Sequence, residues 1–133
     1  MKPVLVDTSV WIRLLRGDPS CAAPLESLAD RNLILGHDLV YGELLIGDTG
    51  GRIGFLKTYA QLPTAPVVPH DEVVALTRMR ALAGRGLSWI DVHLLASALA
   101  SGRWLWSEDR RLGAAARELN IAWDGSGNSN LVH

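Results

Sequence analysis

Short apolar runs alternate along this chain with longer segments whose apolar residues recur every three or four positions. The short runs are rich in β-branched and aliphatic residues and are bounded by polar or turn residues, as buried strands are. They are Val4–Val6, Leu33–Leu35, Pro66–Val68, Leu105–Trp106 and Ile121–Trp123. Strands that alternate with helices predict a mostly parallel sheet with helices on both faces. We therefore expect an α/β fold built on a central five-stranded sheet.

Polar residues and glycines delimit the helical segments, because side-chain oxygens cap the first turn of a helix and glycine tolerates the backbone that ends it. The expected helices are bounded by Asp38 and Gly47, by Asp71 and Gly84, by Ser88 and Gly102, and by Asp109 and Leu119. Right-handed crossovers would place the carboxyl ends of all strands at one edge, where open α/β sheets bind ligands.

Length and composition limit the chain to one ordinary domain. It has 133 residues, 48% of them hydrophobic and 20% charged, with a net charge of −1, which fits a single globular domain of common size. One cysteine excludes an internal disulfide and a CxxC zinc site. No apolar run approaches the roughly 18 residues of a membrane span, and no signal peptide is visible, so we expect a cytoplasmic protein without a membrane partner. The domain is expected to cover residues 1–123, and the Gly-, Ser- and Asn-rich segment 124–133 to be a flexible tail.

Four acidic residues occupy positions that this fold makes special. Asp7 and Asp109 follow predicted strands, Asp91 lies in the first turn of a predicted helix, and Glu43 lies inside an otherwise apolar helical segment. Four carboxylates in one cleft would repel one another unless a cation lay among them. Oxygen-only ligands suit Mg²⁺ or Mn²⁺, and a hard divalent ion in an acidic cleft suits hydrolysis of a phosphodiester.

Helix capping offers an alternative interpretation for three of these acids. Asp7 could cap a helix that begins at Thr8 or Ser9, and Ser88 with Asp91 resembles a capping box. Asp109 could complement the dipole of the helix that follows it. Glu43 has no such alternative, because a carboxylate on a mainly apolar helix is seldom there for packing.

The same residues lie in four segments that resemble a known family. The segments are 7–12 (DTSVWI), 41–47 (YGELLIG), 86–98 (GLSWIDVHLLASA) and 105–112 (LWSEDRRL). In this order and spacing they resemble a PIN domain, and most closely the VapC toxins of bacterial VapBC toxin–antitoxin pairs. The matched stretch runs from about residue 3 to residue 122.

The resemblance implies a metal-dependent endoribonuclease whose catalytic residues are Asp7, Glu43, Asp91 and Asp109. Of these, Asp7, Asp91 and Asp109 would hold Mg²⁺ or Mn²⁺. It further implies a parallel sheet with the first strand at its centre, an RNA substrate, a homodimer, and inhibition by a VapB antitoxin that covers the cleft. The fourth segment departs from the family in having Ser107 where Thr is usual, and its hydroxyl could still orient a neighbouring carboxylate or water.

Other functions of α/β folds fit the sequence less well. A response-regulator receiver needs a late lysine, whereas the only lysines are Lys2 and Lys57. A HAD-type phosphatase needs a second Asp at position 9, which is Ser9, and no GxGxxG motif follows the first strand. The remaining alternative is a non-catalytic PIN-like module that only binds RNA or protein.

Several basic and aromatic residues near the acids allow more than one role. The arginines Arg13, Arg16, Arg110 and Arg111 could hold an RNA backbone, meet acidic residues of an antitoxin, or lie on solvated helix faces. His93 follows Asp91 by two positions and would point to the opposite side of a helix, which favours packing over metal ligation. We expect the tryptophans Trp11, Trp89, Trp104 and Trp106 to lie in the core or an interface.

Overall fold

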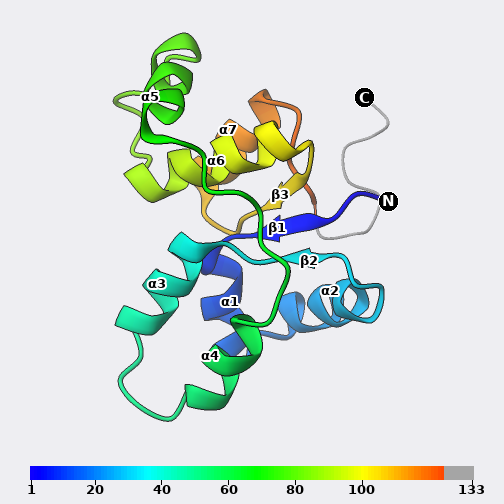
Figure 1. Cartoon of the computed structure of the whole chain (residues 1–133). Coiled ribbons are helices and arrows are strands. Elements are labelled where there is room, and N and C mark those ends of the chain that lie inside the picture. Colours follow the sequence, from blue (N-terminus) through cyan, green and yellow to red (C-terminus); the bar gives the residue numbers. More distant parts are fainter. Residues whose placement is uncertain (125–133) are drawn as a thin grey trace.

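Strands and helices alternate along the chain in the computed structural model, which describes residues 1–124 (Figure 1). In chain order the elements are β1 (Val4–Val6), α1 (Thr8–Leu15), α2 (Pro19–Asp30), β2 (Ile34–Leu35), α3 (Asp38–Ile46), α4 (Ile53–Tyr59), α5 (His70–Met79), α6 (Trp89–Ser101), β3 (Trp104–Trp106) and α7 (Arg110–Glu118).

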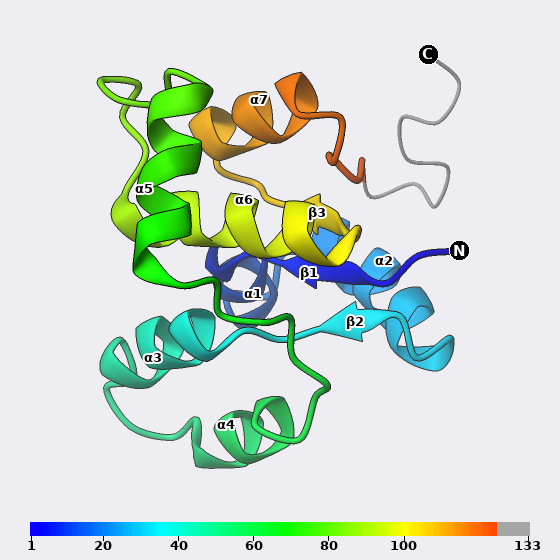
Figure 2. The ribbon, with the colours of Figure 1, turned by 45° about the horizontal axis from the view of Figure 1, so that its top comes forward.

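The sheet is parallel, with strand order β2-β1-β3, so the first strand is central as expected. Every residue of β1 is buried, because neighbours cover the strand on both edges and both faces. Figure 2 shows α6 in front of the sheet and α1 and α2 behind it. The expected α/β class and the helices on both faces are therefore confirmed.

The prediction of five strands is wrong, because the described residues form three. Of the other two predicted runs, Ile121–Trp123 reaches the sheet only through a single parallel bridge between Leu105 and Ala122, and Pro66–Val68 follows a single bridge between Gly36 and Thr64 without joining the sheet itself. Pro66 has no N–H to give to a ladder, so the segment after Thr64 cannot continue as a strand. On the other edge the N–H of Ile121 is already donated to the last turn of α7.

The two residues that were predicted to bound α6 lie at its ends in the structure. Ser88 is its N-cap and forms a reciprocal capping box with Asp91, and Gly102 ends it in the left-handed conformation at φ 65°. The ends of other helices differ. α3 is capped by His37 rather than Asp38, and α5 ends at Met79 instead of continuing to Gly84.

The core brings together side chains from the strands and from one face of each neighbouring helix. α6 contributes an unbroken buried stretch from Val92 to Ala98, which includes His93 and Ser97. No helix within residues 1–124 is long and apolar enough to cross a membrane. The expected tail, 124–133, lies outside the described residues except for Asp124, so the domain boundary at residue 123 stays a prediction.

Candidate functional site

Asp7 lies at the carboxyl end of the central strand and is 4% exposed. It is the N-cap of α1, where its Oδ2 accepts hydrogen bonds from the Ser9 N–H at 3.4 Å and the Ser9 hydroxyl at 2.6 Å. The chain leaves β1 and enters α1 at this residue, so strand position and helix capping together fix the carboxylate at the sheet edge.

A serine from the neighbouring strand end joins the Asp7 and Asp109 loops. The Ser107 hydroxyl donates to Asp7 Oδ2 at 2.8 Å and accepts from the Asp109 N–H at 3.0 Å. The Ser9 hydroxyl in turn accepts from the Glu108 N–H at 2.9 Å. The expectation that Ser107 orients a neighbouring carboxylate is confirmed.

Glu43 reaches this edge from α3. Its Oε1 accepts a hydrogen bond from the Thr8 hydroxyl at 2.6 Å, across 35 positions of sequence. The Glu43 side chain is therefore aimed at the amino end of α1, directly beside Asp7 in the chain. This contact explains why the helix carries a carboxylate that packing alone would not favour.

Asp91 lies in the first turn of α6, and Asp109 is the N-cap of α7; these two helices flank β3. Asp91 Oδ2 accepts from the Ser88 N–H at 2.9 Å, and Asp109 Oδ1 accepts from the N–H groups of Arg111 and Leu112 at 2.9 and 3.0 Å. Asp91 is half-buried and Asp109 is exposed.

The charges of the four acids influence the pKa values of two of them, Glu43 and Asp91. Burial raises the pKa of Glu43, and repulsion by Asp7 and Asp91 raises it further, against the hydrogen bond from Thr8. Burial also raises the pKa of Asp91, with further contributions from Asp7 and Asp109. Groups that lie 36, 48 and 18 positions apart in sequence thus form one electrostatic cluster, which we call the acidic cluster.

The capping interpretation is confirmed for Asp7, Asp91 and Asp109, and it leaves the site interpretation open. A carboxylate has two oxygens, and within residues 1–124 the caps use only one oxygen of each of these acids. Glu43 likewise has one oxygen outside its hydrogen bond with Thr8. Four carboxylate oxygens are thus free to accept, and a set of oxygen donors fits a hard divalent cation.

The four acidic side chains do not converge on a common point. In the part of the chain that the structure describes, no three His, Cys, Asp or Glu side chains are grouped closely enough to hold a metal ion as they stand. The acidic cluster is therefore an open arrangement in this structure.

Arginines surround the acidic cluster. Arg13 of α1 pairs with Asp18 at 3.8 Å and with Glu108 at 3.5 Å, and it links α1 to the segment just before Asp109. Arg16 and the two arginines that follow Asp109, Arg110 and Arg111, are exposed. Positive side chains therefore flank the acids on α1 and α7.

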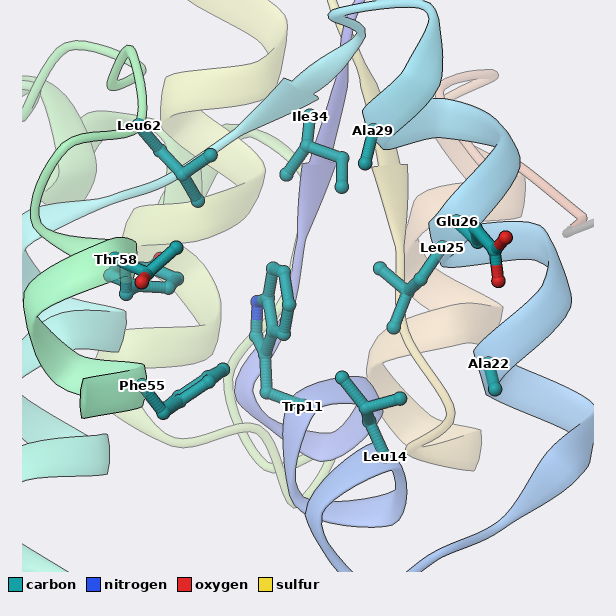
Figure 3. Close-up of a pocket in the computed structure, with 11 residues that line it drawn as sticks. Trp11, Leu14, Ala22, Leu25, Glu26, Ala29, Ile34, Phe55, Thr58 and Leu62 are labelled. Carbon is teal, nitrogen blue, oxygen red and sulfur yellow. The ribbon is translucent and has the colours of Figure 1, made fainter. Parts of the chain in front are cut away.

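An apolar groove of about 350 Å³ lies on another face, between α1, α2 and α4 (Figure 3). Trp11 stands at its centre, with Phe55 and Thr58 of α4 on one side and Leu25 of α2 on the other. The Trp11 indole N–H is satisfied internally by the Val6 carbonyl at 3.2 Å. Most of the lining is apolar, and Glu26 of α2 is the charged residue in it.

The expected packing of His93 is confirmed by its burial, and three of the four tryptophans lie in the core; Trp89 is exposed. The sequence interpretation missed two features of the site. The first is the role of Thr8 toward Glu43, which the motif Asp-Thr-Ser contains but does not reveal. The second is His37, whose place at a loop–helix junction gave no signal of its full burial.

The fold and the acidic cluster define a class: a parallel α/β protein that gathers carboxylates where its strands end. Comparison with known proteins agrees with this class. Residues 4–118 match the PIN domain family. The chain is 45% identical over 120 residues to Ribonuclease VapC32 of Mycobacterium tuberculosis, in strains CDC 1551 and H37Rv alike, which covers 90% of this chain and 94% of the relative.

A solved structure, that of PAE2754 from Pyrobaculum aerophilum, has the same fold with a TM-score of 0.61 and 22% identity, over 95% of this chain and 91% of that one. The chain therefore belongs to the PIN-domain family, and within it to the VapC group.

Proposed function

We propose that this protein is a metal-dependent endoribonuclease and acts as the toxin of a VapBC-type pair in the cytoplasm. The observation that carries the proposal is the acidic cluster, in which Asp7, Glu43, Asp91 and Asp109 approach one another although they repel. The 45% identity to a protein named as a ribonuclease supports the same reaction.

The donor set fits Mg²⁺ or Mn²⁺. Asp7, Asp91 and Asp109 would hold the ion, directly or through water, by the oxygens that their caps leave free. When bound, such an ion supplies charge neutralisation at the phosphodiester and lowers the pKa of a bound water.

The other residues of the site bind and orient. The Thr8 hydroxyl holds the Glu43 carboxylate through a hydrogen bond of 2.6 Å. Glu43 accepts a hydrogen bond from the attacking water and so orients that water in line with the leaving oxygen. Ser107 holds Asp7 in place through its 2.8 Å hydrogen bond. Arg110 and Arg111 contact the RNA backbone, which gives affinity and salt dependence with little sequence choice.

The apolar groove supports the proposed antitoxin. The groove has a mostly apolar lining, which suits the apolar face of an amphipathic segment from a VapB-like partner. Ala29 is exposed on α2 at the groove, whereas Ala23 is exposed on the same helix outside it. We expect Ala29→Glu to keep nuclease activity but lose inhibition by the antitoxin. Ala23→Glu should remain inhibited, and equal inhibition of both variants would contradict this docking site.

A homodimer is the proposed assembly. Leu45 and Ile46 are adjacent at the end of α3 and are largely exposed, which supports a contact with a second copy there. Sedimentation or light scattering of the purified chain tests it, and a monomer at micromolar concentration would contradict it.

The nuclease proposal is tested by RNA cleavage with Mn²⁺ or with a chelator. Asp7→Asn removes one charge of the acidic cluster but keeps an acceptor for Ser9 and Ser107. Asp18→Asn is the matched control, because Asp18 caps α2 through the same Asp-x-Ser contact, with Ser20, away from the cluster. We expect wild type and Asp18→Asn to cleave RNA and Asp7→Asn not to. Full activity of Asp7→Asn, or of wild type in chelator, would point to a different site, and no cleavage by wild type with Mn²⁺ would favour the non-catalytic PIN-like module.

A further inference from the structure

An imidazole takes the place of the usual small cap at the start of α3. His37 is 0% exposed, and its Nδ1 accepts a hydrogen bond from the Leu39 N–H at 3.0 Å. Ser, Thr, Asp or Asn would cap the helix equally well with a shorter side chain. The backbone N–H of His37 donates to the Tyr59 hydroxyl at 3.0 Å. Capping alone therefore does not account for a histidine here.

The remaining ring nitrogen makes a contact that no short cap could reach. Because Nδ1 accepts from an amide, the proton of the neutral ring is on Nε2, which donates to the Ser97 Oγ at 2.9 Å. The Ser97 hydroxyl then donates to the Pro66 carbonyl at 2.6 Å. Ser97 is also 0% exposed. A directed chain of hydrogen bonds thus joins the start of α3 to the middle of α6 and to the segment before α5.

The two helices joined in this way carry two members of the acidic cluster. Glu43 is on α3 and Asp91 is on α6, and the negative charge of Asp91 contributes to the raised pKa of Glu43. Repulsion between these like charges favours separation of the two helices. The buried contact between His37 and Ser97 opposes this separation with neutral groups, which add no charge of their own.

We propose that His37 and Ser97 form a positioning bridge that holds α3 against α6 and so keeps Glu43 placed relative to Asp91, which is one of the proposed metal ligands. Neither residue touches the cation or the RNA; both act through the placement of α3 and α6. This inference rests on the proposed function, because it assigns the bridge to the metal site of the nuclease. It adds His37, which lies outside the four sequence segments that define the acids, and gives a role to Ser97 in the third segment.

His37→Asn and Ser97→Ala break the bridge from opposite ends. Asn is among the best N-cap residues, so His37→Asn keeps the cap of α3 and loses only the reach to Ser97. Ser101→Ala is the matched control, because the Ser101 hydroxyl donates to the Ser97 carbonyl at 2.6 Å within the same helix and does not reach α3.

The measurement is the dissociation constant for Mn²⁺, by calorimetry or by the electron paramagnetic resonance signal of free Mn²⁺, with RNA cleavage recorded alongside. We expect both bridge variants to bind Mn²⁺ about tenfold more weakly, as is usual when the support of a metal ligand is removed. The double variant should be no weaker than either single variant. Saturating Mn²⁺ should restore kcat, because the four acids are unchanged, and Ser101→Ala should match wild type.

The possible results separate the two proposals. If wild type binds Mn²⁺ and both bridge variants bind it equally well, the positioning bridge is overturned and the proposed function stands. Equal weakening in Ser101→Ala would also overturn it, because a general loosening of α6 would then explain the effect. If wild type neither binds Mn²⁺ nor cleaves RNA, the proposed function fails and the bridge fails with it. Circular dichroism of each variant confirms that it is folded before binding is measured.

Discussion

Replacing Asp91 by asparagine separates a helix cap from a metal ligand. In wild type, Asp91 accepts a hydrogen bond from the Ser88 N–H at 2.9 Å, and the side-chain oxygen of Asn can accept the same bond. The Ser88 hydroxyl can still accept from the backbone N–H of residue 91. The change removes a charge that Asp7 and Asp109 repel, and it also removes a favourable charge at a helix N-terminus, worth about 0.3–1 kcal/mol. These effects oppose each other, so the metal-free variant should unfold within about 1 kcal/mol of wild type, or be more stable.

Mn²⁺ should then distinguish the two proteins. A ligand at a hundred times its dissociation constant stabilises the folded state by about 2.7 kcal/mol, which for a chain of this length raises Tm by about 8 °C. Thermal melts with and without Mn²⁺ measure the shift, with Asp18→Asn as the control for a lost capping charge. We expect the shift in wild type and in Asp18→Asn, and its absence in Asp91→Asn. A full shift in Asp91→Asn would refute the assignment of Asp91 as a ligand.

Three further predictions concern single groups. Burial, and to a smaller extent His93, lowers the pKa of His37 against the opposing effect of Asp38. As the pH falls below about 6.5, His37 is therefore protonated in the unfolded chain before it is protonated in the folded protein. The unfolding free energy of wild type should drop there by up to about 1.4 kcal/mol per pH unit more than that of His37→Asn, and parallel pH profiles in urea melts would contradict this. Ser107→Ala should lower stability by about 1 kcal/mol and reduce RNA cleavage, because Asp7 loses a donor, while Ser107→Thr should retain both properties; an unaffected Ala variant would count against this role. Replacing Arg110 and Arg111 by Gln should weaken RNA binding and lower its salt dependence by roughly two phosphate contacts; an unchanged salt slope in filter binding would place these side chains away from the RNA.

The α/β class could be predicted from the sequence, because it depends on local periodicity, and the central position of the first strand was implied by the family resemblance. α6 is the clearest case, since Ser88 and Gly102 mark both of its ends. The number of strands could not be predicted, because an apolar run such as Pro66–Val68 pairs only if its backbone donors are free, and proline has none. Pairing also depends on competing partners, as for the Ile121 N–H.

The residues of the candidate site could be predicted for a different reason. Carboxylates at strand ends and in first helical turns are visible in the sequence, so Asp7, Asp91 and Asp109 could be named, and Glu43 could be named as an acid inside an otherwise apolar helical segment. Whether those acids cap helices or hold a cation could not be decided, since one carboxylate can do both with different oxygens. The contact between His37 and Ser97 joins residues 60 positions apart, and nothing in the local pattern at either residue indicates the other.

The central claim is that the fold gathers these four acids to hold one or more hard divalent ions. Crystals grown with Mn²⁺ test it most directly, because the anomalous scattering of manganese locates the ion independently of the surrounding atoms. We predict a strong anomalous peak among Asp7, Asp91 and Asp109, with Glu43 beside it, that disappears in Asp7→Asn. Mn²⁺ absent from this edge at concentrations that support RNA cleavage, or bound only elsewhere on the chain, would contradict the account.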